Sequence, residues 1–224
     1  MKHIDLNADL GEGGAEDAAL LELVNSANIA CGGHAGSEEI MRQTIALAIS
    51  AGVAAGAHPG YEDRENFGRR EMQLSAESVT ELVARQIEKF VIISGGAVHH
   101  VKPHGALYNQ ASRDPSLAAA VIKGIQRIAP AALLYAMPNS ALAAAGRAAG
   151  LVVRAEGFAD RRYRPDGSLV PRGEPGAVIS NVEEAVAQAL ELLHSGRIET
   201  LCVHGDGPHA LAMLRAIRAA FSAE

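Results

Sequence analysis

The sequence predicts an α/β protein: a seven-stranded parallel β/α barrel, similar to a TIM barrel, that forms one domain over residues 1–224. Strand-like and helix-like segments alternate along the whole chain, which is typical of a parallel sheet. They make about seven βα units of roughly 32 residues each, the length of a βαβ crossover. Polar residues gather at the carboxyl end of nearly every strand. A barrel brings all these ends into one ring, whereas a doubly wound sheet uses mainly those at its switch point, so we favour a barrel.

Seven short segments, apolar or β-branched and bounded by turn residues, are the predicted strands. In chain order they are His3–Asp9, Ser26–Cys31, Val53–His58, Val98–Lys102, Leu133–Met137, Leu151–Ala155 and Leu201–His204. In the first strand Asp5, Asn7 and Asp9 alternate with apolar residues, so the three polar side chains share one face. That face is either the barrel lumen or a solvated edge. Inward-facing polar groups must be hydrogen-bonded or used in function.

Helix signals lie between these strands. Ser37, Ser75, Asp114 and Asn181 are predicted N-caps, and Pro208 is predicted to start the last helix. The alanine-rich stretch Ala141–Gly150 is predicted to be a further helix.

The stretch Asp160–Pro175 is the longest one without helix signals. It carries the turn dipeptide Asp166-Gly167 between short flanks. These features predict a small hairpin excursion over the barrel mouth.

Composition excludes several classes of protein. A net charge of −6 and an aromatic content of 4% argue against a nucleic-acid partner, which would need a basic face. Cys31 and Cys202 are the two cysteines, too few for a disulfide framework, which indicates a reducing compartment. No apolar run reaches the length of a membrane span and no signal peptide is visible, so we expect a cytoplasmic protein. Neither G-x-x-x-x-G-K-[ST] nor G-x-S-x-G occurs.

The candidate site residues lie at or just beyond the predicted strand ends and in the loops beside them. They are Asn7, Asp9, Glu12, His34, His58, Arg70, Lys102, His104, Glu156, Asp160, Arg161, Arg162, His204 and Asp206. Histidines on four different strands favour a site over isolated structural polar residues. Carboxylates and histidines could bind zinc or manganese across a barrel, but no compact ligand motif such as H-E-x-x-H is present. Cys31 is either a nucleophile or, more in keeping with its apolar strand, a small buried residue.

Long motifs resemble the LamB/YcsF family, in order over essentially the whole chain. They are Asp5-Leu-Asn-Ala-Asp-Leu-Gly-Glu12, Ser26-Ala-Asn-Ile-Ala-Cys-Gly-Gly-His-Ala-Gly36, Gly56-Ala-His-Pro-Gly-Tyr61, Phe67-Gly-Arg-Arg70, His100-Val-Lys-Pro-His-Gly-Ala-Leu-Tyr-Asn109, Glu156-Gly-Phe-Ala-Asp-Arg-Arg-Tyr163, Leu169-Val-Pro-Arg172, Pro175-Gly-Ala-Val178 and Cys202-Val-His-Gly-Asp206. The segments before Leu20 and after Gly196 are shorter than is usual in the family, so this chain resembles a trimmed member.

The resemblance implies a barrel of the glycoside hydrolase/deacetylase type and the A subunit of an ATP-dependent bacterial 5-oxoprolinase. That enzyme opens the lactam of 5-oxoproline to glutamate, with ATP and its magnesium counter-ion and with two partner subunits, B and C. We take this as the leading hypothesis. A metal-dependent deacetylase or carbohydrate hydrolase with a divalent metal is the alternative, and a non-catalytic binding subunit is a third.

Roles follow from chemistry under the leading hypothesis. Lys102 or the Arg161-Arg162 pair would receive the substrate carboxylate or a phosphoryl group. His104 or His58 would act as general acid or base. The carboxylate that orients this histidine or activates water would be Asp9, Glu12 or Asp206. The substrate-binding set would be Asn7, His34, Arg70, Glu156, Asp160, Arg161, Arg162 and His204.

Overall fold

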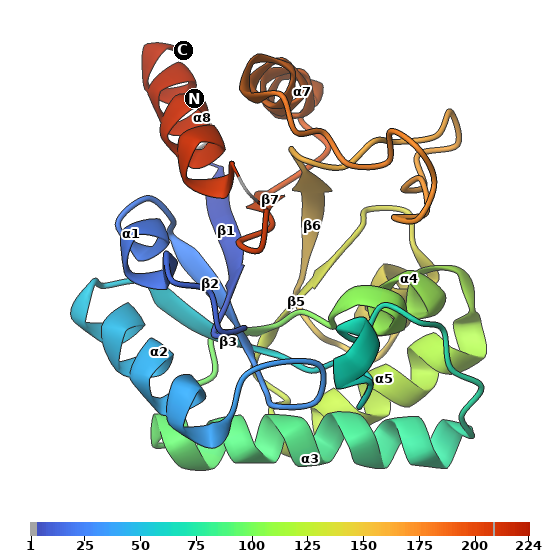
Figure 1. Cartoon of the computed structure of the whole chain (residues 1–224). Coiled ribbons are helices and arrows are strands. Elements are labelled where there is room, and N and C mark those ends of the chain that lie inside the picture. Colours follow the sequence, from blue (N-terminus) through green and yellow to red (C-terminus); the bar gives the residue numbers. More distant parts are fainter. Residues whose placement is uncertain (1–3, 208) are drawn as a thin grey trace.

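Seven parallel strands close into a barrel in the computed structural model, which describes residues 4–207 and 209–224 (Figure 1). The strands are β1 Asp5–Leu10, β2 Ser26–Ala30, β3 Ala54–His58, β4 His100–Val101, β5 Leu133–Ala136, β6 Val153–Phe158 and β7 Thr200–Val203. Each pairs with the next, and β1 pairs with β7 to close the ring. The predicted seven-stranded parallel barrel is therefore confirmed.

Helices follow the strands and surround the barrel (Figure 1). They are α1 Asp17–Leu21, α2 Glu38–Ser50, α3 Ala76–Ser94, α4 Gly105–Arg113, α5 Pro115–Ile128, α6 Ala141–Ala148, α7 Val182–Ser195 and α8 Ala210–Ala223, with a 3₁₀ turn η1 at Arg64–Asn66. The predicted caps Ser37, Ser75, Asp114 and Asn181 each accept a hydrogen bond from a backbone N–H of the first turn. His3 and Pro208, named in the predicted first strand and last helix, lie outside the described residues.

Two strands differ from the prediction in a way that matters for the site. β4 is only two residues long, and β6 begins at Val153, whereas Leu151 was predicted to begin it. The apolar run at Leu151 does not start the strand because the backbone N–H of Leu151 is bonded to Gly146 at the end of α6. Glu156 consequently lies inside β6, where its side chain is fully buried.

Helix α4 was not predicted. Pro103 and Gly105 suggest a loop, yet the helix begins at Gly105, where φ is +52°. Its start directly after β4 places His104 at the barrel mouth.

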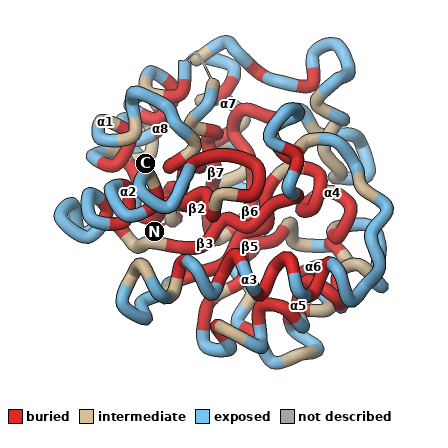
Figure 2. The backbone as a smooth tube through the Cα atoms, turned by 60° about the horizontal axis from the view of Figure 1, so that its bottom comes forward, coloured by how far each residue is buried: buried red, intermediate tan, exposed pale blue. Residues whose placement is uncertain are grey.

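Polar side chains fill the barrel lumen, while apolar ones face the helices. The carboxylate of Asp5 accepts hydrogen bonds from Ser26 and Thr200, and Asn7 and Asp9 lie above it on the same face. The predicted polar face of the first strand is thus the lumen and not a solvated edge. Figure 2 shows the buried strands at the centre and exposed residues on the outer helices. Hydrogen bonds across the lumen offset the cost of burying so many polar groups.

The stretch after β6 forms the predicted excursion. Arg161 and Val178, and further out Tyr163 and Leu169, make isolated antiparallel bridges, with Asp166-Gly167 in the turn between them. Within residues 4–207 and 209–224, no helix combines the length and hydropathy that a membrane span needs.

Candidate functional site

Asp9 is at the centre of the polar groups at the barrel mouth. Its Oδ1 accepts hydrogen bonds from Lys102 Nζ at 2.8 Å and Asn28 Nδ2 at 2.8 Å. Its Oδ2 lies 3.5 Å from His58 Nε2 and 3.9 Å from His204 Nε2. Burial alone would raise the pKa of Asp9, but Lys102 and then His58 outweigh it and hold the pKa well below its usual value. Asp9 is therefore a buried carboxylate, facing histidines from β3 and β7.

The ammonium group of Lys102 donates its hydrogen bonds to protein groups. Nζ contacts Asp9 at 2.8 Å, Glu156 Oε1 at 3.0 Å and Cys202 Sγ at 3.0 Å. Burial opposes the ammonium, but the carboxylates, Asp9 first, raise the pKa of Lys102 well above its usual value. The sequence hypothesis let Lys102 receive a substrate carboxylate. With its three protons directed at protein groups, we assign it instead to holding Asp9 ionised and Glu156 in place.

Glu156 connects Lys102 to residues that lie deeper in the barrel lumen. Its Oε2 accepts a hydrogen bond from Tyr108 Oη at 2.9 Å and its Oε1 lies 3.3 Å from Asn7 Nδ2. Asn7 is fully buried and also accepts from Asn28 Nδ2 at 2.7 Å. Both residues were predicted to bind substrate. Their positions below the mouth suit them to support Lys102.

His204 and Asp160 form a hydrogen-bonded pair at the open side of the ring. Nδ1 of His204 lies 3.0 and 2.9 Å from the two carboxylate oxygens, and the backbone N–H of His204 donates to the same carboxylate at 3.1 Å. Burial raises the pKa of Asp160, but His204 outweighs it, so the net shift is downward. The carboxylate keeps the proton of His204 on Nδ1 and leaves Nε2 free to exchange a proton. Sequence reasoning had assigned the acid–base role to His104 or His58.

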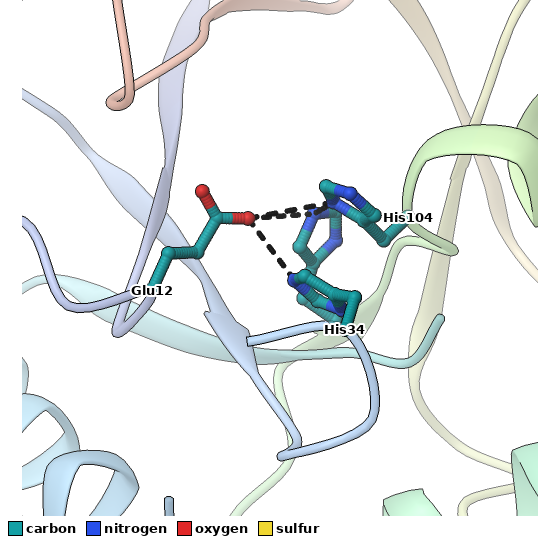
Figure 3. A group of neighbouring side chains, drawn as sticks. Glu12, His34 and His104 are labelled. Carbon is teal, nitrogen blue, oxygen red and sulfur yellow. Dashed lines mark hydrogen bonds and ion pairs between the residues drawn. The ribbon is translucent and has the colours of Figure 1, made fainter. Parts of the chain in front are cut away.

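Glu12, His34, His58 and His104 form a second cluster beside Asp9, from the ends of four successive strands. One ligand atom from each of the four side chains lies within 4.8 Å of the other three. Oε1 of Glu12 is 3.1 Å from His34 Nε2 and 3.4 Å from His104 Nδ1 (Figure 3). Burial, then the charges of Asp9 and Asp206, raise the pKa of Glu12 well above its usual value. Burial lowers the pKa values of His34 and His104. These four groups could hold a metal ion.

Three arginines gather at the rim of the mouth. Arg69 and Arg172 pair with Asp206 at 2.5 and 3.5 Å. Arg161 is buried; its guanidinium donates to the carbonyl of Val170, and its buried Nε has no partner among the described residues. Burial, then the charge of Arg172, lower the pKa of Arg161. Such a concentration of guanidinium groups suits a small anion. Asp206, a predicted catalytic residue, contacts these arginines; burial raises its pKa, but Arg172 and then Arg69 outweigh burial and lower it.

Two predicted arginines make their contacts elsewhere. Arg162 pairs with Glu184 of α7 at 2.7 Å. Arg70 pairs with Asp63 at 3.5 Å and has a side chain that is 64% exposed. We leave both outside the candidate site. Cys31 is buried, and burial raises its pKa to about 12, which favours the small buried residue over the nucleophile.

The chain is similar in sequence and structure to known proteins. Residues 4–224 match the model of the LamB/YcsF family. The chain belongs to the LamB/YcsF family. It is similar to a solved lactam utilization protein from Thermus thermophilus, with 40% identity, coverage of 100% of this chain and 97% of that chain, and a TM-score of 0.90.

More distant barrels share only the fold with this LamB/YcsF chain. A family 4 carbohydrate esterase from Streptomyces lividans is 12% identical, and the match covers 99% of this chain and 88% of the esterase chain with a TM-score of 0.51. A T48 deacetylase has 14% identity, 99% and 84% coverage, and a TM-score of 0.53. These likenesses show the β/α barrel fold alone.

Several residues of this LamB/YcsF site escaped the sequence reasoning. Tyr108 lies in the unpredicted helix α4, and Cys202 is an apolar-looking residue of β7 whose sulfur meets Lys102. Arg69 was considered with Arg70, but no pattern distinguished the two adjacent arginines. Asn28 alternates with Ser26 on β2, and this period of two could have placed it in the lumen.

Proposed function

We propose that this chain binds 5-oxoproline and opens its lactam ring to glutamate, as the A subunit of an ATP-dependent 5-oxoprolinase with partner subunits B and C. The observation that carries the proposal is the full-length similarity to a protein named for lactam utilization. The chemistry of the barrel mouth agrees with it, since arginines for a carboxylate lie beside a histidine–aspartate pair and a second carboxylate.

Each site group has a task in this proposal. The carboxylate of 5-oxoproline binds the rim arginines and displaces Asp206 from part of its contacts. A water held beside Asp9 Oδ2 and His204 Nε2, which are 3.9 Å apart, is deprotonated by His204. Its oxygen bonds to the ring carbonyl carbon, the C–N bond breaks, and the ring nitrogen takes the proton. Asp160 orients His204 throughout.

ATP supplies the driving force in this proposal. A lactam is a poor electrophile, and transfer of the γ-phosphoryl group to its carbonyl oxygen, which releases ADP, makes the carbon more reactive. Addition of the first water and cleavage of the C–N bond then leave an acyl phosphate, which a second water hydrolyses to glutamate and inorganic phosphate. The chain has no Walker-type phosphate loop, so ATP with magnesium either binds here in another way or is handled by a partner subunit.

The test follows glutamate formation from 5-oxoproline with ATP and magnesium, using this chain alone and with subunits B and C. We expect the isolated chain to be folded and almost inactive, and the three chains together to be active. Rapid turnover by the chain alone would move the whole mechanism into this barrel. No glutamate from any combination would refute the proposed function.

A metal-dependent deacetylase or carbohydrate hydrolase is the second candidate. The cluster of Glu12 with three histidines is the observation that favours it. Release of acetate from N-acetylated sugars, lost on chelation, would support this candidate over the first.

The rim arginines provide a specific prediction. In the assembled enzyme, Arg172→Ala raises the KM for 5-oxoproline about ten- to hundredfold and changes kcat less. This increase in KM corresponds to the loss of one charge-assisted hydrogen bond to the substrate carboxylate. Arg162→Ala is the matched control, because Arg162 pairs with Glu184 on α7 and should leave both constants unchanged. Steady-state kinetics on the two variants check this. Equal KM values would remove the rim arginines from substrate binding.

A further inference from the structure

The histidine cluster beside Asp9 has nitrogen lone pairs that face one another. His58 Nδ1 lies 2.7 Å from the backbone carbonyl oxygen of Lys102. His104 Nε2 lies 2.9 Å from the backbone carbonyl oxygen of Phe67. A carbonyl oxygen only accepts, so the hydrogen bonds place the protons on these two nitrogens. The remaining nitrogens, Nε2 of His58 and Nδ1 of His104, then carry lone pairs, and they are only 2.9 Å apart.

The carboxyl group of Glu12 lies in the same space. Its Oε1 is 3.4 Å from His104 Nδ1 and 4.0 Å from His58 Nε2. The ammonium of Lys102 makes its ion pairs with Asp9 and Glu156 instead. Two lone pairs and a carboxylate oxygen thus converge, an arrangement that repels itself unless a positive charge lies between them. Either a metal ion or a proton can supply that charge.

The surrounding chain is built to keep this arrangement. Phe67 has φ +54°, a left-handed conformation that is strained for a non-glycine residue. The carbonyl of Phe67 is the group that fixes the tautomer of His104, so the strained residue is the one that orients this ring. A backbone carbonyl on the far nitrogen of each ring is the arrangement that orients metal-binding histidines.

We propose that His58 Nε2, His104 Nδ1 and Glu12 bind a divalent transition metal of the zinc type, with His34 as a fourth ligand. Neutral imidazoles with one carboxylate are a ligand set for zinc and its neighbours. His34 Nε2 faces Glu12 at 3.1 Å, and its buried Nδ1 has no partner among the described residues (Figure 3). No described donor holds Nδ1 as an acceptor, so Nδ1 can carry the ring proton while Nε2 presents a lone pair to the ion. This proposal is independent of the proposed function.

The test measures metal binding directly. The purified chain is stripped with a chelator, its metal content is checked by mass spectrometry, and it is titrated with Zn²⁺ and with Co²⁺. We expect one equivalent of metal per chain and the visible absorption of Co²⁺ in a low-coordinate site with nitrogen ligands. His104→Ala and Glu12→Gln should each weaken binding at least about a hundredfold, and His34→Ala by less. Glu12→Gln keeps the shape of the side chain, so it gives an answer even if His104→Ala does not fold.

His194→Ala is the matched control, because His194 is an exposed histidine of α7 that pairs with Glu224. It should leave metal affinity unchanged. Two results would overturn the proposal: no stoichiometric binding of either metal, or binding that survives both His104→Ala and Glu12→Gln. Nitrogen NMR of the stripped chain tests the competing explanation. A charged imidazolium at neutral pH, together with no metal binding, would show that a proton fills the space.

Discussion

Lys102→Ala lowers oxoproline turnover by the assembled enzyme at least about hundredfold and destabilises the folded chain by about 3–5 kcal/mol at neutral pH. Both effects have one cause. Asp9 and Glu156 are buried and take their positive charge from Lys102 at 2.8 and 3.0 Å, so removing it leaves two uncompensated carboxylates in the lumen. The buried ion pairs of Lys102 therefore couple its loss to both function and stability.

The stability of this variant should depend on pH with a defined sign. Without the cation, burial raises the folded-state pKa of Asp9 above its unfolded value. The protonated form of Asp9 is tolerated in the lumen, so the stability deficit is small at low pH, grows as pH rises from the unfolded pKa and reaches its full size above the folded pKa. Urea denaturation of the wild type and variant at several pH values measures it. A deficit that is the same at every pH would contradict the ion-cluster explanation.

Two further variants separate stability from catalysis. Lys102→Met combined with Glu156→Gln removes one charge of each sign, so it should recover part of the stability but not the activity. Lys89→Ala removes a half-exposed lysine paired with Glu38 on the surface and should change neither. Normal turnover by a destabilised Lys102→Ala enzyme would leave Lys102 with a purely structural role.

Asp160→Asn lowers kcat about 10³–10⁴-fold while leaving the fold intact. The asparagine oxygen still accepts the backbone N–H of His204, so its amide NH₂ meets Nδ1 of the imidazole. Nδ1 then accepts, the ring proton moves to Nε2, and the nitrogen that faces Asp9 can no longer take a proton from water. Kinetics on the assembled enzyme and nitrogen NMR of His204 measure the two consequences.

The tautomer distinguishes this positioning role from a merely structural one. Asp160→Asn should move the ring proton of His204 from Nδ1 to Nε2, which a loss of packing would not do. Asp166→Asn, on the exposed turn of the same excursion, is the matched control and should behave as the wild type. Unaltered kcat in Asp160→Asn would exclude His204 as the general base.

Much of this barrel could be predicted from local patterns. Period-two alternation in β1 places Asp5, Asn7 and Asp9 on one face, and short apolar runs with capped helices between them predict the order of the elements. Closure of the sheet into a barrel is then predicted from the number of βα units and from the polar residues at the strand ends. Helices α1 and α4 and the bounds of β4 and β6 were among the exceptions. Pro103 and Gly105 suggest a loop where tertiary packing starts α4.

The sequence itself determined which side chains could reach the mouth of this barrel, because residue type and position near a strand end can be read from it. The tertiary structure alone decided their roles, because roles depend on partners far apart in the chain. Lys102 became a buried counter-ion through contacts with Asp9 and Glu156, and Asp160 made His204 the best candidate base. Two backbone carbonyls aimed the lone pairs of His58 and His104 at each other. Hydrogen bonds and charge pairs act over a few ångströms in space, and no spacing along the sequence records those distances.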